Sequence, residues 1–226
     1  FSHLKSDFVD ALIPKMNLVK TELGQGNISL WSDVIDLGKP LIQTSLEYLF
    51  MPIYLFVWIL PTDIGFTIAV ILKALIGALG MYFWLVDLKV RKSVAVIVGV
   101  VYAFSGFNMS WFLGNAAIVG EFAPWVFFFV NRIYETKNVG KLWKYSIALI
   151  LVYFFLIISG FVAGAGYVIY FSAFYVLILF IIDVIVWSKT KERSFILNIR
   201  TGLLVLLSII FAVGLGSIML LPNLEW

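Results

Sequence analysis

Hydrophobic residues in this chain fall into long runs that short polar connections separate. Six such runs occupy residues 64–88, 94–113, 118–134, 145–162, 166–188 and 201–221. A helix needs roughly 20 apolar residues to cross the hydrocarbon core of a bilayer, and most of the runs approach or exceed that length. The third run is short and contains Pro124, so its ends are the least sharply defined. The pattern predicts an all-α, polytopic helical membrane protein with about six spans.

A mixed polar region precedes the spans. Apolar residues recur every three or four positions from Phe8 to Leu23, with acids and lysines between them. This spacing predicts an amphipathic helix on a membrane surface or on the helical bundle, ended by Gly24 and Gly26. Residues 31–39 indicate an ordered loop, and Gly38, Lys39 and Pro40 mark its end.

One apolar stretch, residues 47–60, is too short for a comfortable span and is closed by Pro61. It predicts a re-entrant or interfacial helix. The chain thus divides into an extracytoplasmic loop with an amphipathic helix, residues 1–46, and a transmembrane helical domain, residues 47–226. The sequence starts without a methionine and stops just after an apolar run, so we expect this domain to be incomplete at both ends.

The distribution of charge predicts the orientation. With six spans, three basic connections fall on the same side of the membrane, and by the positive-inside rule this side is cytoplasmic. Most acids gather on the other side, so residue 1 is expected outside the cell. The basic residues in these connections are Lys89, Arg91, Lys92, Arg132, Lys137, Lys141, Lys144, Lys189, Lys191, Arg193 and Arg200.

Composition excludes several classes of protein. Of the 226 residues, 62% are hydrophobic and 13% are charged, which rules out a disordered chain and an ordinary soluble domain. Cysteine is absent and His3 is the single histidine, so disulfides, thiolate metal sites and Ser-His triads have no basis. The lysines flank membrane spans, so nothing supports binding to nucleic acid.

Lys73 is the most informative single residue, because it lies well inside the first long span. A charge there is costly and usually faces a partner or a polar cavity. A flexible lysine beneath the outer interface suits an anionic group, above all a phosphate. The alternatives are that Lys73 extends to the outer head groups, or that it pairs structurally with Asp63 or Glu121.

Carboxylates near the N-terminus form a second candidate site. Asp7 and Asp10 are three residues apart and would share one helix face, where they could hold Mg²⁺ or Mn²⁺, or one could act as a general base. Asp33 and Asp36 repeat this spacing. The alternative is that these acids are simply solvated in an outer loop.

An aromatic-rich outer edge is the third feature. It is interpreted either as an ordinary aromatic belt or as a groove for a lipid tail or a sugar ring. A small polar step, Ser105 to Asn108, interrupts the second span, and such breaks are tolerated where backbone lines protein or a cavity. The residues assigned to the possible groove are Trp31, Asp33, Asp36, Tyr54, Asn108, Trp111 and Glu121.

Several sequence blocks occur in an order that is similar to a known family. They are SDFVDALIPK, GNISLWSDVIDLGKPLIQTSLEYLFMPIYLF, LKALIGALGMYFWL, VVYAFSGFNMSWF, PWVFFFVNRIYE and LGSIMLLPNLEW. Together they resemble the YfhO family of bacterial multi-spanning membrane proteins, which resembles the GT-C class of glycosyltransferases. The resemblance implies a GT-C-like fold, a polyprenyl-phosphate-linked sugar donor and action on the outer face of the bacterial cytoplasmic membrane. It also implies a cell-envelope acceptor such as lipoteichoic acid.

The resemblance assigns roles to two residues. Asp7 matches the family's early acid, a base or metal-site residue, and Lys73 falls in the Lys-containing block. The resulting hypothesis is that Asp7 takes the proton of the acceptor hydroxyl while Lys73, with or without a divalent cation, steadies the departing phosphate. The competing hypotheses are a non-catalytic structural subunit with membrane complex partners, and a transporter of lipid or polymer.

Overall fold

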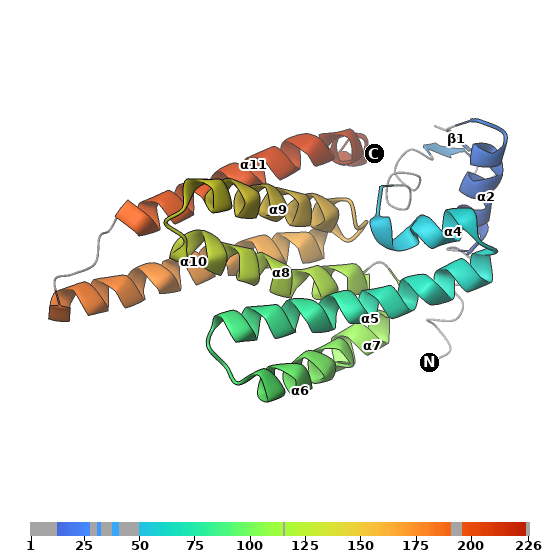
Figure 1. Cartoon of the computed structure of the whole chain (residues 1–226). Helices are drawn as coiled ribbons and strands as arrows, with labels where there is room; N and C mark the ends of the chain where they lie inside the picture. Colours follow the sequence, from blue (N-terminus) through green and yellow to red (C-terminus); the bar gives the residue numbers. More distant parts are fainter. Residues whose placement is uncertain are drawn as a thin grey trace.

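A computed structural model describes residues 13–27, 31–32, 38–40, 50–114, 116–190 and 196–224 (Figure 1). Nearly all the regular structure in these ranges is helical, so the predicted all-α fold is confirmed. One short antiparallel pair joins β1 (Trp31–Ser32) to β2 (Lys39–Pro40). The helices are α2 (Ile13–Gly24), η2 (Pro52–Tyr54), α4 (Leu55–Ile59), α5 (Thr62–Asp87), α6 (Lys92–Ala103), α7 (Gly106–Trp111), α8 (Ala116–Glu135), α9 (Val139–Ile157), α10 (Val162–Thr190) and α11 (Ile196–Leu224).

Six helical segments in the described part of the chain are long and apolar enough to cross a membrane, as predicted. They are Thr62–Asp87, Lys92–Trp111, Ala116–Glu135, Val139–Ile157, Val162–Ser188 and Ile199–Ser217. The second segment is α6 followed by α7, and the break between these helices falls at the small polar step noted in the sequence. The protein is therefore a multi-pass membrane protein.

The region before the spans is helical where the structure describes it. Helix α2 buries Met16 and Val19, two positions of the predicted amphipathic pattern. Lys20 fastens α2 to α4 by donating hydrogen bonds to the carbonyls of Val57 and Leu60. The predicted re-entrant or interfacial helix corresponds to η2 and α4, which pack against α5 (Figure 1). At the ends of the predicted ordered loop, Trp31 and Ser32 pair with Pro40 and Lys39 in a short antiparallel ladder.

Helix α8 lies at the centre of the bundle and is the most buried of the six spans. It contacts α5, α9, α10 and α11. Close packing against α5 depends on small residues: a Cβ at Gly80 would lie 2.7 Å from Cδ1 of Trp125. The indole Nε1 of Trp125 donates to the Ile76 carbonyl at 2.9 Å, which locks the two helices in register.

The end of the bundle where α5 finishes and α9 begins is called the basic end, and the opposite end, beside α2, is called the α2 end. Buried polar groups join the spans at the basic end. Asp87 accepts from Arg132 Nη2 at 2.9 Å and from Asn131 Nδ2 at 2.6 Å. Tyr134 donates to Asp183 at 2.6 Å, and Arg200 donates to the carbonyls of Ile133 and Thr136. The sequence predicts that this end is cytoplasmic.

Substitution of Gly80 by alanine tests the close contact between α5 and α8. The new methyl group must displace Trp125 and weaken its bond to Ile76, so we expect Gly80→Ala to destabilise the fold by about 1–3 kcal/mol. Gly214→Ala in α11 is the matched control, because a Cβ there meets nothing within 4 Å. Thermal unfolding in detergent should show a lower Tm for the first variant and an equal or higher Tm for the second. Equal Tm values for the two variants would contradict the packing.

Candidate functional site

Lys73 lies inside the bundle, and only 1% of its surface is exposed. Its Nζ donates to the carbonyl of Phe112 at 3.2 Å and to that of Gly114 at 3.0 Å. Both carbonyls belong to the turn between α7 and α8. The same ammonium lies 5.6 Å from the centre of the Tyr54 ring and 6.0 Å from that of Phe66, so two aromatic faces complete its surroundings.

These contacts show how Lys73 is held; its interaction with Glu121 is electrostatic, without a hydrogen bond. The side chain does not reach the head groups, because it is buried. Its hydrogen bonds go to backbone carbonyls instead of to Asp63 or Glu121. An ammonium has three donors, and the two carbonyls use two of them. One N–H therefore remains for a further acceptor.

Glu121 is a buried carboxylate that interacts electrostatically with Lys73. It lies on α8 against Gly77 of α5, one helical turn beyond Lys73, and only 3% of it is exposed. The charges of Lys73 and Glu121 attract each other. The Oε2 atom of Glu121 has no hydrogen-bond partner, which is unusual for a buried carboxylate.

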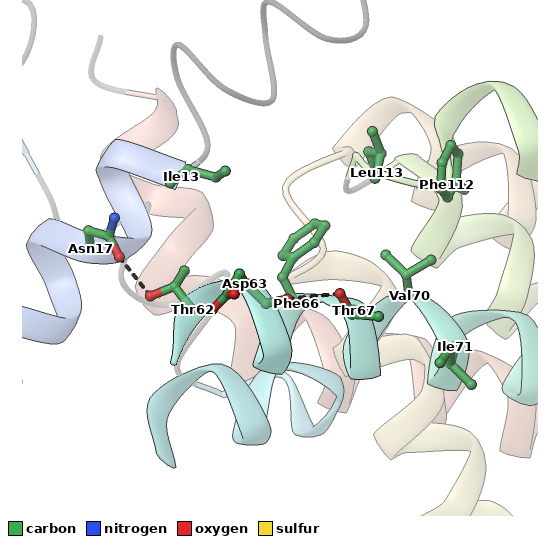
Figure 2. A pocket seen from close by; sticks show the side chains of 10 residues that line it. All are labelled: Ile13, Asn17, Thr62, Asp63, Phe66, Thr67, Val70, Ile71, Phe112 and Leu113. Atoms are coloured by element: carbon green, nitrogen blue, oxygen red, sulfur yellow. Dashed lines mark hydrogen bonds between the residues drawn. The ribbon is translucent and has the colours of Figure 1, made fainter. Parts of the chain in front are cut away.

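A cavity of about 660 Å³ opens at the α2 end, and Figure 2 shows its lining. Lys73 lies behind its wall, since the ring of Phe66 and the carbonyl of Phe112 that it contacts belong to lining residues. Thr62 donates to the Asn17 side chain at 2.7 Å, which ties α2 to α5 at the rim. The lining residues are Ile13, Asn17, Thr62, Asp63, Phe66, Thr67, Val70, Ile71, Phe112 and Leu113. We call this space the α2-end cavity.

A second space of about 470 Å³ runs between α5, α6 and α7 and is called the lateral groove. Its lining is almost entirely apolar, apart from Asn108 and Glu121. Val70, Ile71 and Phe112 line both spaces, so the groove and the α2-end cavity are neighbours. The other lining residues of the groove are Ala74, Leu75, Ala78, Val100, Ala103, Phe104 and Met109.

The structure brings together some of the residues that the sequence singled out. Tyr54 packs beneath the Lys73 ammonium, while Asn108 and Glu121 line the lateral groove. Trp111 lies exposed on α7, and Trp31 lies over Gly38, where a Cβ would be 3.1 Å from its ring. Neither tryptophan lines the two spaces. The candidate acids Asp7, Asp10, Asp33 and Asp36 fall outside the described residues.

Sequence reasoning missed several residues of the α2-end cavity. The sequence singles out Asp63 as an alternative partner for Lys73, and in the structure it lines the cavity together with Thr67 and Asn17. A signal was present in the sequence, because an acid in the first turn after Pro61 and a threonine four residues later share a helix face. The contribution of Asn17 could not be found this way, since it comes from a different helix.

The described ranges contain no group of three or more His, Asp or Glu side chains placed to hold a metal ion. The pair considered for Mg²⁺ or Mn²⁺, Asp7 and Asp10, lies outside those ranges, so that site stays a prediction. Comparison of the chain with protein-family models, with curated proteins and with solved structures gave no match.

Cysteine labelling tests which end of the bundle faces outward. The chain has no native cysteine, so single variants report on one position each. Asn17→Cys lies at the rim of the α2-end cavity, and Lys137→Cys is its counterpart at the basic end. In intact cells, a membrane-impermeant maleimide should label the first variant and spare the second, which should react only after permeabilisation. The reverse pattern would contradict the predicted orientation.

Proposed function

We propose that this chain belongs to a membrane glycosyltransferase that moves a sugar from a polyprenyl-phosphate donor to a cell-envelope acceptor. The reaction takes place on the outer face of a bacterial cytoplasmic membrane, with the α2 end outside. The observation that carries the proposal is the buried Lys73 ammonium, which lies directly behind the α2-end cavity and beside the lateral groove. A polyprenyl-phosphate sugar combines an anion with a long apolar chain. The anion suits the Lys73 ammonium, and the apolar chain suits the lateral groove.

The donor phosphate enters the α2-end cavity in this proposal. Lys73 has one N–H left after its two carbonyl bonds, and a phosphate oxygen accepts it when the cavity wall at Phe66 and Phe112 shifts. Because the surroundings are apolar, this charge interaction is stronger than it would be in water. It strengthens further as negative charge builds on the departing phosphate, which is the condition for lowering the barrier.

Asp7 is the proposed general base. It precedes Ile13, a lining residue of the α2-end cavity, by six positions, and six residues span at most about 22 Å. The chain length therefore permits Asp7 to reach the cavity. There it takes the proton of the acceptor hydroxyl while the oxygen attacks the anomeric carbon and the phosphate leaves. In this proposal Mg²⁺ or Mn²⁺, if used, is held at Asp7 and Asp10.

Two variants distinguish the proposed roles. Lys73→Met should lower sugar transfer about 10²–10³-fold and weaken donor binding, because the donor loses its phosphate contact. Asp7→Asn should lower transfer by a similar factor and leave donor binding intact, because only proton removal is lost. The measurement is transfer of labelled sugar from its polyprenyl phosphate in proteoliposomes, with equilibrium binding of the same donor.

Lys92→Met and Glu135→Gln are the matched controls for these variants. Both residues are exposed at the basic end and should leave transfer unchanged. If Lys73→Met and Asp7→Asn, folded as judged by their Tm, transfer sugar at the unsubstituted rate, the enzymatic assignment is wrong. A chain that never transfers sugar but keeps its partners in the membrane would favour the structural subunit.

A further inference from the structure

The proposed sugar transfer leaves the Glu121 carboxylate without a role. This residue is 3% exposed, its Oε2 has no hydrogen-bond partner, and it lines the lateral groove. A carboxylate in apolar surroundings carries a large desolvation cost unless a donor compensates it. Glu121 packs against Gly77 of α5, where a Cβ would lie 3.5 Å from the Glu121 Cγ, in ordinary van der Waals contact.

Donors around Glu121 are directed to backbone carbonyls instead. Asn108 donates through Nδ2 to the Tyr102 carbonyl at 2.9 Å, and the Tyr102 hydroxyl donates to the Gly120 carbonyl at 2.6 Å. Lys73 is bonded to Phe112 and Gly114. In the described part of the chain no donor is bonded to Oε2 of Glu121, the spare N–H of Lys73 included, so a donor from a ligand would complete the site.

The groove itself selects an apolar ligand. Ile71, Leu75 and Phe104 are exposed along it, and they belong to spans that face the membrane. Its volume of about 470 Å³ is in the usual range for small-molecule sites. Glu121 is five residues, about 7.5 Å, from the start of α8, and it lies against Gly77, which is fifteen residues, about 22 Å, from the start of α5.

The charges of Lys73 and Glu121 limit the kinds of lipid head group that can bind in the lateral groove. Lys73 lies close enough to Glu121 to interact with it electrostatically, so a second cation such as an ammonium is disfavoured. The carboxylate itself repels a phosphate. A neutral hydroxyl satisfies both conditions, because it donates one hydrogen bond and brings no charge.

We propose that the lateral groove is a binding site for a neutral acyl lipid with a free hydroxyl, of the diacylglycerol class, whose hydroxyl donates to Oε2 of Glu121. The acyl chain lies along α5 and α6. This site does not depend on the sugar-transfer proposal, since it uses a different carboxylate and holds whether or not the chain transfers sugar.

Photolabelling of the chain in dioleoylphosphatidylcholine nanodiscs tests the site. The probe is a dioleoylglycerol with a diazirine on one acyl chain, and mass spectrometry locates the label. We expect label on peptides of α6 and α7 that line the groove. Unlabelled 1,2-dioleoylglycerol should compete at least about tenfold better than its acetate ester, because a hydrogen bond to a charged group is worth roughly 1.5–3 kcal/mol and the ester has no donor.

Variants test whether Glu121 causes the preference for the alcohol over its acetate ester. Glu121→Leu should remove the difference between the alcohol and the ester, while Glu121→Gln, which keeps a carbonyl acceptor, should retain part of it. Glu135→Gln, at the other end of the same helix, is the matched control and should behave as the unsubstituted chain. Ala74→Trp fills the groove and should abolish the labelling of α6 and α7.

Three results would overturn the proposal. The first is equal competition by the alcohol and the ester in the unsubstituted chain, which needs no variant to fold. The second is label that lies away from the groove or persists in Ala74→Trp. The third is a folded Glu121→Leu variant for which 1,2-dioleoylglycerol still competes better than its acetate ester by the same factor as for the unsubstituted chain. Label in the groove with the expected preference in the first two tests supports the site even where Glu121→Leu does not fold.

Discussion

Lys73 can lie within a membrane-spanning bundle because the turn after α7 presents two backbone carbonyls to its ammonium. The carbonyls of Phe112 and Gly114 are free to accept because α7 ends at Trp111 and α8 begins only at Ala116. A continuous helix would have used them internally. The broken second span and the buried lysine therefore depend on each other, as expected where no water is present to satisfy polar groups.

This interaction also shapes the two spaces beside it. Phe112 is held by the lysine through its carbonyl and forms part of the wall of both the α2-end cavity and the lateral groove. Behind that wall, α8 is drawn against α5 at Gly77 and Gly80, which brings Glu121 within electrostatic reach of Lys73. The basic end is organised differently, by direct side-chain bonds such as that of Asp87 with Arg132. At the α2 end the described lysines Lys20 and Lys73 bond to backbone carbonyls, whereas at the basic end Asp87 and Asp183 bond to side chains of α8.

Hydropathy was sufficient to predict the six spans, because a helix that meets lipid must be apolar over a fixed length. The short α4, closed by Pro61, and the break at Ser105 were also visible, since proline and small polar residues act locally on the backbone. Lys73 could be singled out by the cost of its charge. The partners of Lys73 could not be predicted, because the choice among Asp63, Glu121 and backbone carbonyls depends on how α5, α7 and α8 pack.

The amino-acid sequence by itself determined the class of protein, the number of spans and the one lysine that had to be explained. These follow from the free energy of transferring side chains between water and lipid, which depends little on residues that are distant in the sequence. The tertiary structure decided that Lys73 bonds to carbonyls, that Glu121 keeps an unpartnered oxygen in an apolar groove, and that Asp63 and Asn17 share a cavity. Each of these depends on contacts between different helices, whose geometry is set by packing of glycines and aromatic rings and leaves no periodic pattern along the chain.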